Sequence, residues 1–155
     1  MFELLEKSAY ADWFLLSMWG FPTFIAIHSV GMAIAAGLGL VLSLRYFGFR
    51  DQFNHSVLQA LFRVAWIGFF INLVTGLALL APRISEYLFD PTFLVKMAFV
   101  LIAVFGMYVL HRDFRLFDRR PEKNTMRVFA ALTVTAWVGA ITTGRWIAYL
   151  SGLYG

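Results

Sequence analysis

The chain has 155 residues, of which 61% are hydrophobic and 14% charged, and its formal net charge is +4. Soluble domains average about 45–50% apolar residues, so this composition indicates a membrane protein and excludes a typical soluble enzyme. The chain has no cysteine, which excludes disulfides, thiolate metal sites, iron–sulfur clusters and haem attached through cysteine.

Residues 1–20 are predicted to form an amphipathic helix along the membrane surface. Apolar side chains recur there at three- and four-residue spacing, at Phe2, Leu5, Ala9, Trp13 and Leu16. Polar side chains fall on the other side, at Glu3, Glu6, Lys7 and Tyr10. Such a pattern is typical of an interfacial helix, with the apolar stripe toward the lipid.

Four long apolar stretches follow. A bilayer core of about 30 Å needs roughly 20 helical residues to cross it. The predicted spans are Phe21–Arg45, Phe62–Ala81, Thr92–Leu110 and Val128–Leu150. The predicted fold is therefore an all-α integral membrane protein: a four-transmembrane-helix bundle preceded by an N-terminal interfacial amphipathic helix, in a single membrane domain, 1–155.

Small residues predict how the spans pack, because they let helix backbones approach closely in lipid. Span one carries an i,i+4 stripe, formed by Gly31, Ala35, Gly39 and Ser43. Span two carries Gly68, Asn72 and Gly76 at the same spacing. The amide of Asn72 needs a polar partner at this depth, and an interhelical hydrogen bond is favoured over a ligand contact. Asp90 followed by Pro91 predicts the N-cap and first residue of span three.

Basic residues predict the orientation. Nine of the thirteen Lys and Arg lie in, or at the edges of, the loops between spans one and two and between spans three and four. By the positive-inside rule these loops are cytoplasmic, so both termini face the periplasm of a bacterial inner membrane. Acidic residues in the same loops argue against nucleic-acid binding.

Three ionisable residues are predicted at one depth. His28 lies six residues after Pro22, Lys96 six after Asp90, and Arg145 about six before the end of span four, each about 9 Å below the outer boundary. No carboxylate occupies a span. Lys96 leans toward the surface and can snorkel to water or lipid phosphate, whereas Arg145 leans inward and is the better candidate for a buried partner.

The histidines are candidate cofactor residues. His28 is either a hydrogen-bonding link to another helix or a ligand of haem iron or donor to a quinone. His111, at the inner end of span three, is either an interfacial polar residue or a second cofactor-binding residue. It lies about 20 Å from His28 along the bundle, so the two cannot bind the same iron within one chain.

The combination of motifs resembles an uncharacterised family of small four-helix bacterial inner-membrane proteins. The matching residues are Phe21-Pro22, His28-Ser29-Val30-Gly31-Met32-Ala33, Leu44-Arg45-Tyr46-Phe47-Gly48, Trp66-Ile67-Gly68, Thr75-Gly76, Asp90-Pro91-Thr92-Phe93 with Lys96, His111-Arg112, and Gly144-Arg145-Trp146-Ile147-Ala148-Tyr149. The resemblance implies a four-helix bundle without an assigned reaction. Ser43 departs from the pattern, which usually has an acid there. A more distant likeness to cytochrome b561-type and copper-resistance membrane bundles supports a redox role by analogy.

These features favour two functions. The first is a membrane electron-transfer subunit that binds a b-type haem or a quinone near the periplasmic face, with His28 as iron ligand or donor and with Lys96 and Arg145 holding the polar groups. The alternative is a cofactor-free structural or anchoring subunit of a larger membrane complex. A small transporter is less favoured, because no discontinuous helix or internal repeat is visible. The expected partners are the lipid bilayer and other membrane or periplasmic subunits.

Overall fold

The computed structural model describes residues 4, 6–48, 54–116 and 124–153, and no strand occurs within these ranges. Four helices in it are long and apolar enough to cross a membrane. In chain order the elements are α2 (Ala9–Leu16), α3 (Gly20–Leu44), the 3-10 turn η1 (Arg45–Phe47), α4 (His55–Leu80), the 3-10 turn η2 (Ala81–Arg83), α5 (Ile84–Leu88), α6 (Pro91–Leu116) and α7 (Asn124–Leu153).

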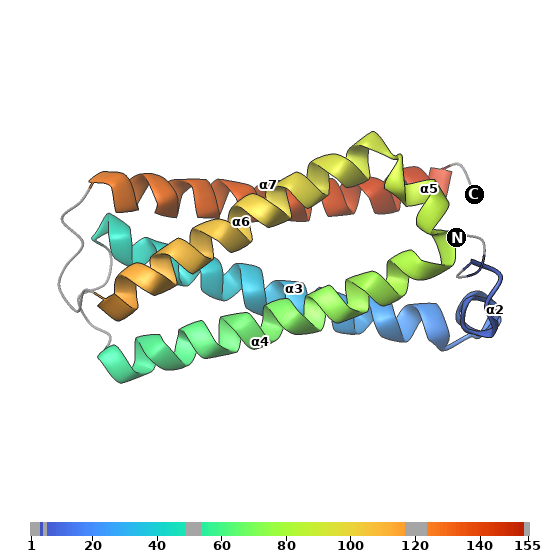
Figure 1. Cartoon of the computed structure of the whole chain (residues 1–155), viewed down its shortest axis with the longest axis horizontal. Coiled ribbons are helices and arrows are strands. Elements are labelled where there is room, and N and C mark those ends of the chain that lie inside the picture. Colours follow the sequence, from blue (N-terminus) through green and yellow to red (C-terminus); the bar gives the residue numbers. More distant parts are fainter. Residues whose placement is uncertain (1–3, 5, 49–53, 117–123, 154–155) are drawn as a thin grey trace.

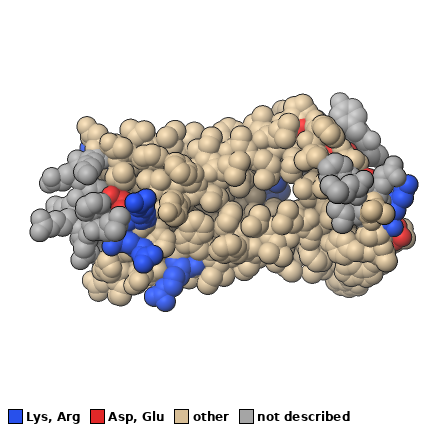
Figure 2. Space-filling view, viewed as in Figure 1, with Lys and Arg blue, Asp and Glu red and all other residues tan. Residues whose placement is uncertain are grey.

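The long helices form two antiparallel pairs that run the length of the molecule (Figure 1). α3 packs mainly on α4, α6 packs mainly on α7, and α3 also contacts α7. α2 and α5 lie together at one end, which we call the α2 end (Figure 1). Basic side chains gather at the other end, the arginine end (Figure 2), where exposed arginines include Arg63, Arg112, Arg115 and Arg127.

The predicted spans are correct in number, but the second, third and fourth are too short at the arginine end. α4 begins at His55 rather than Phe62, α6 continues to Leu116 rather than Leu110, and α7 begins at Asn124 rather than Val128. A helix needs only its own backbone hydrogen bonds to continue beyond the apolar stretch. At the other end Asp90 Oδ1 accepts hydrogen bonds from the backbone N–H groups of Thr92 and Phe93, which confirms the predicted cap.

The small-residue stripe of α3 is buried along its whole length, as predicted: Gly31, Ala35, Gly39 and Ser43. A Cβ at position 31 would lie 2.8 Å from the backbone nitrogen of Asn72, and one at position 68 would lie 3.0 Å from that of Ala35. The backbones of α3 and α4 therefore touch where Gly31 meets Gly68.

Buried side chains gather in the middle of the bundle and toward the arginine end. The three buried clusters are formed by residues 35–42 of α3, Tyr46 of η1, 58–65 of α4, 103–114 of α6 and 130–137 of α7. These clusters join the two helix pairs where they meet. Toward the α2 end α4 and α6 diverge in the view of Figure 1.

α2 is shorter than the predicted helix 1–20, and the face that packs on the bundle was not predicted. Ser8 caps it, and its buried residues are Ala11 and Phe14, whereas Trp13 and Leu16, predicted on the apolar side, are exposed. Phe2 and Leu5, predicted on the apolar side, and Glu3, predicted on the polar side, lie outside the described residues. Tyr10, predicted on the polar side, donates from its hydroxyl to the carbonyl of Ala78 at 3.0 Å. Trp13 and Leu16 are thus free of the bundle, as a stripe toward the lipid requires, and their contact with lipid stays a prediction.

Candidate functional site

His28 of α3 is the centre of a polar link to α4. Its Nδ1 lies 3.0 Å from the carbonyl oxygen of Asn72 and 3.2 Å from Thr75 Oγ1. Thr75 donates its own proton to the carbonyl of Ile71 at 2.7 Å, so Nδ1 carries the ring proton and donates to Asn72. Gly76 leaves space for the ring, because a Cβ there would lie 3.1 Å from His28 Cε1.

Asn72 completes this link from the other direction. Its Nδ2 donates to the carbonyl oxygen of His28 at 2.9 Å and lies 3.4 Å from His28 Nε2. The predicted interhelical hydrogen bond of Asn72 is therefore confirmed. Both ring nitrogens of His28 face polar groups of α4, so the imidazole is held in one orientation.

Lys96 of α6 turns toward α7. A Cβ at position 144 would lie 3.5 Å from Lys96 Cε and 3.7 Å from Nζ, so the end of the Lys96 side chain lies in contact distance of α7 at Gly144. The side chain is half-buried. The predicted snorkelling of Lys96 toward the surface stays a prediction.

A slot of about 250 Å³ lies between the two helix pairs at this level. The space-filling view shows the surface hollowed there, with a basic side chain at the edge (Figure 2). The lining is largely apolar or aromatic and comes from all four long helices and α5: Phe21, Ile25, His28, Phe69, Asn72, Leu73, Gly76, Leu77, Leu79, Leu80, Tyr87, Phe93, Lys96, Met97, Val100, Gly144 and Ile147. The structure thus brings His28 and Lys96 to one cavity.

Arg145 does not line the slot, although the sequence analysis placed it with His28 and Lys96. Its side chain is exposed. Successive residues of an α-helix are turned by about 100°, and α7 directs Gly144 and Ile147 to the slot, so Arg145 points elsewhere. The spacing of Ala136, Ala140 and Gly144 was the missed signal, because this i,i+4 series of small residues marks the packed face of α7.

His111 lies toward the arginine end, apart from the slot. Its Nδ1 accepts a hydrogen bond from Trp66 Nε1 at 3.1 Å, and its ring stacks on Phe62 with centroids 4.6 Å apart. These contacts join α6 to α4. His28 and His111 therefore do not belong to one site, as predicted from their positions along the helices.

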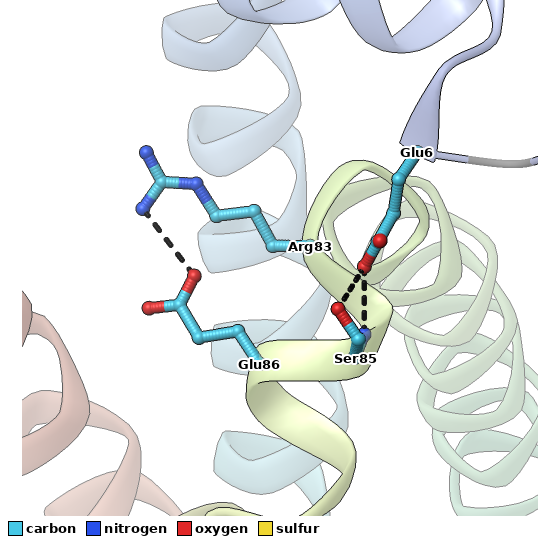
Figure 3. Close-up of polar contacts among 4 residues, drawn as sticks. All are labelled: Glu6, Arg83, Ser85 and Glu86. Carbon is cyan, nitrogen blue, oxygen red and sulfur yellow. Dashed lines mark hydrogen bonds and ion pairs between the residues drawn. The ribbon is translucent and has the colours of Figure 1, made fainter. Parts of the chain in front are cut away.

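Lys96 has no counterion among the described residues. No Asp or Glu lines the slot, and Lys96 has no hydrogen bond or ion pair within the described ranges. Two acids in the region of α5 contact neighbouring residues instead of Lys96 (Figure 3): Glu86 lies 3.9 Å from Arg83, and Glu6 accepts hydrogen bonds from Ser85. Asp90 is the cap of α6. The slot therefore combines apolar walls with one unpaired positive charge.

Comparison with protein-family models, curated proteins and solved structures gives no match for this chain. The resemblance to a family of small four-helix membrane proteins thus stays a prediction.

Proposed function

We propose that the chain is a membrane electron-transfer subunit that binds the head group of a quinone in the slot. The observation that carries this proposal is the unpaired ammonium of Lys96 in an otherwise largely apolar cavity. A quinone has a flat, mostly apolar ring with two carbonyl oxygens that accept hydrogen bonds. Lys96 supplies three N–H donors, and Phe69 and Phe93 supply aromatic surface beside the ring.

Quinone fits this cavity better than haem b does. Ligand cavities are about 300–1,000 Å³, so a slot of about 250 Å³ suits a single ring rather than a porphyrin. Iron ligation by His28 would have to use Nε2, because Nδ1 donates to the carbonyl of Asn72; Nε2 faces the Asn72 amide at 3.4 Å rather than open space. In this proposal His28 shapes the wall of the site and Lys96 contacts the ligand.

Quinone reduction takes two electrons and two protons and yields the quinol. In this proposal the electrons come from a redox protein that docks at the α2 end, and the protons come from water. The chain holds the ring, and the ammonium of Lys96 stabilises the negative charge that develops on a quinone oxygen.

We infer that the arginine end faces the cytoplasm and that the α2 end, with both termini, faces the periplasm of a bacterial inner membrane. The concentration of exposed arginines at one end (Figure 2) supports this orientation through the positive-inside rule. The slot then lies in the outer half of the bilayer.

The test compares Lys96→Met with Arg145→Met. Both substitutions remove one positive charge, but only Lys96 lines the slot. Protein is purified in mild detergent, and the lipids extracted from it are identified by mass spectrometry. We expect the unaltered chain and Arg145→Met to retain quinone and Lys96→Met to retain at least about tenfold less, since a hydrogen bond from a charged donor contributes about 1.5–3 kcal/mol.

Three results oppose the proposal. Equal retention by both variants contradicts the role of Lys96, and a phospholipid retained in place of quinone contradicts the ligand. If the unaltered chain retains neither, the cofactor-free subunit becomes the favoured function. That second candidate is supported by the His28–Asn72 link, which explains both side chains by helix packing.

A further inference from the structure

The slot opens to the outside of the bundle between α4 and α6. Leu73 and Leu77 of α4 line it, yet they are 40% and 58% exposed. The buried side chains that join α4 to α6 belong to residues 58–65 and 107–114, toward the arginine end. α3 and α7 pack against each other, so the open side is the one between α4 and α6.

The wall at the α2 end is built from aromatic and apolar side chains. Tyr87 of α5 and Phe93 of α6 both line the slot, with ring centroids 6.0 Å apart. Behind them the N-terminal segment is tied to the same region, because Glu6 accepts hydrogen bonds from Ser85 (Figure 3). These side chains therefore cover the slot at the α2 end, whereas the side between α4 and α6 is open.

The polar and apolar parts of the slot are separated. His28 and Lys96 mark the part toward α3 and α7, where Lys96 lies beside Gly144. Leu73, Leu77 and Val100 form the apolar part toward the opening between α4 and α6. A ligand with a polar ring and a long hydrocarbon tail matches this order.

We propose that the slot takes a long-tailed quinone from the bilayer, with the ring beside Lys96 and the tail leaving between α4 and α6 across Leu77. This inference rests on the proposed function and adds the entry path and the class of quinone. It makes Leu77 a residue that contacts the tail, not the ring. The aqueous side at the α2 end is not the route of entry.

The test uses two probes with the same ring, a dimethoxy-methyl-benzoquinone without a tail and its decyl derivative. Binding to the detergent-solubilised full chain is measured by equilibrium dialysis. Leu77→Trp places a bulky side chain at the opening. Val74→Trp is the matched control, because Val74 is on the same helix and 64% exposed but does not line the slot.

We expect Leu77→Trp to raise the Kd of the decyl quinone about tenfold or more by steric exclusion and to leave the Kd of the tail-less ring unchanged. Val74→Trp changes neither. Unchanged binding of the decyl quinone to Leu77→Trp overturns the entry path and leaves quinone binding intact. Equal weakening of both probes places the ring, not the tail, at Leu77 and also overturns the inference. Failure of the unaltered chain to bind either probe overturns the proposed function itself.

Discussion

Gly31→Ala is expected to separate α3 from α4 and so to disturb the slot. The new Cβ would lie 2.8 Å from the backbone nitrogen of Asn72, and contacts of this kind are ordinarily about 3.4 Å or longer. The clash is with backbone, so no side chain can relieve it. A shift of about 0.6 Å would lengthen the 3.0 Å bond from His28 Nδ1 to the Asn72 carbonyl to about 3.6 Å, beyond hydrogen-bond range.

The magnitude follows from three contributions. Overpacking costs about 1–3 kcal/mol, and loss of an interhelical hydrogen bond in a membrane protein costs about 0.6 kcal/mol. Replacing glycine by alanine within a helix recovers up to about 1 kcal/mol. We therefore expect a net loss of about 1–3 kcal/mol, which lowers Tm by roughly 2–4 °C per kcal/mol for a chain of this size.

Gly37→Ala is the matched control, because nothing lies within 4 Å of a Cβ at that position of the same helix. The assay is thermal unfolding in mild detergent, followed by circular dichroism, together with the amount of quinone retained. We expect Gly37→Ala to be as stable as the unaltered chain or more stable. A Gly31→Ala protein with the Tm of Gly37→Ala would refute the reasoning that close contact at Gly31 holds the two helices.

Three further predictions use other parts of the chain. Cysteine introduced at exposed Ser85 should react with an impermeant maleimide on intact cells, whereas cysteine at Asn124 should not; the reverse result would invert the proposed orientation. Hydrogen bonds from Ser85 lower the pKa of Glu6 below 4.5, so the contact persists above that pH and is lost as the carboxylate is protonated below it. Protection of the Ser85 amide against exchange with deuterium, relative to the intrinsic exchange rate at each pH, should therefore fall only in acid, and Glu6→Gln should remove this pH dependence. His111→Ala should leave Trp66 Nε1 without its partner and destabilise the chain by about 1–3 kcal/mol, while quinone retention, measured by mass spectrometry, stays unchanged.

Features set by neighbouring residues along the chain were predictable from the sequence. The four spans, the buried stripe through Gly31 and Gly39, and the cap at Asp90 each depend on local spacing and hydropathy. The link from Asn72 to another helix was predictable as a requirement, because an amide at this depth needs a partner. His28, the partner of Asn72, was predicted as a site residue because of its depth, and it was not predicted to bind Asn72.

Features set by helix rotation were not predictable from depth alone. His28, Lys96 and Arg145 share an expected level, but only the first two line the slot. Depth follows from counting residues, whereas direction depends on which face of each helix is packed. The same limit applies to α2, where the burial of Phe14 against the bundle was not predicted.

The position of the slot follows from how the helices are joined. Large buried side chains such as Trp137 and Met107 fill the middle and the arginine half, and there the two helix pairs are held together. In the half toward α2, the residues between the pairs include Gly76 and Gly144, which supply no side chain to fill the space. Lys96 enters that space from α6, and no acid in the described part of the chain pairs with it, which favours the proposed ligand that accepts hydrogen bonds. The small residues that could be taken for packing positions are therefore the ones that make room for the site.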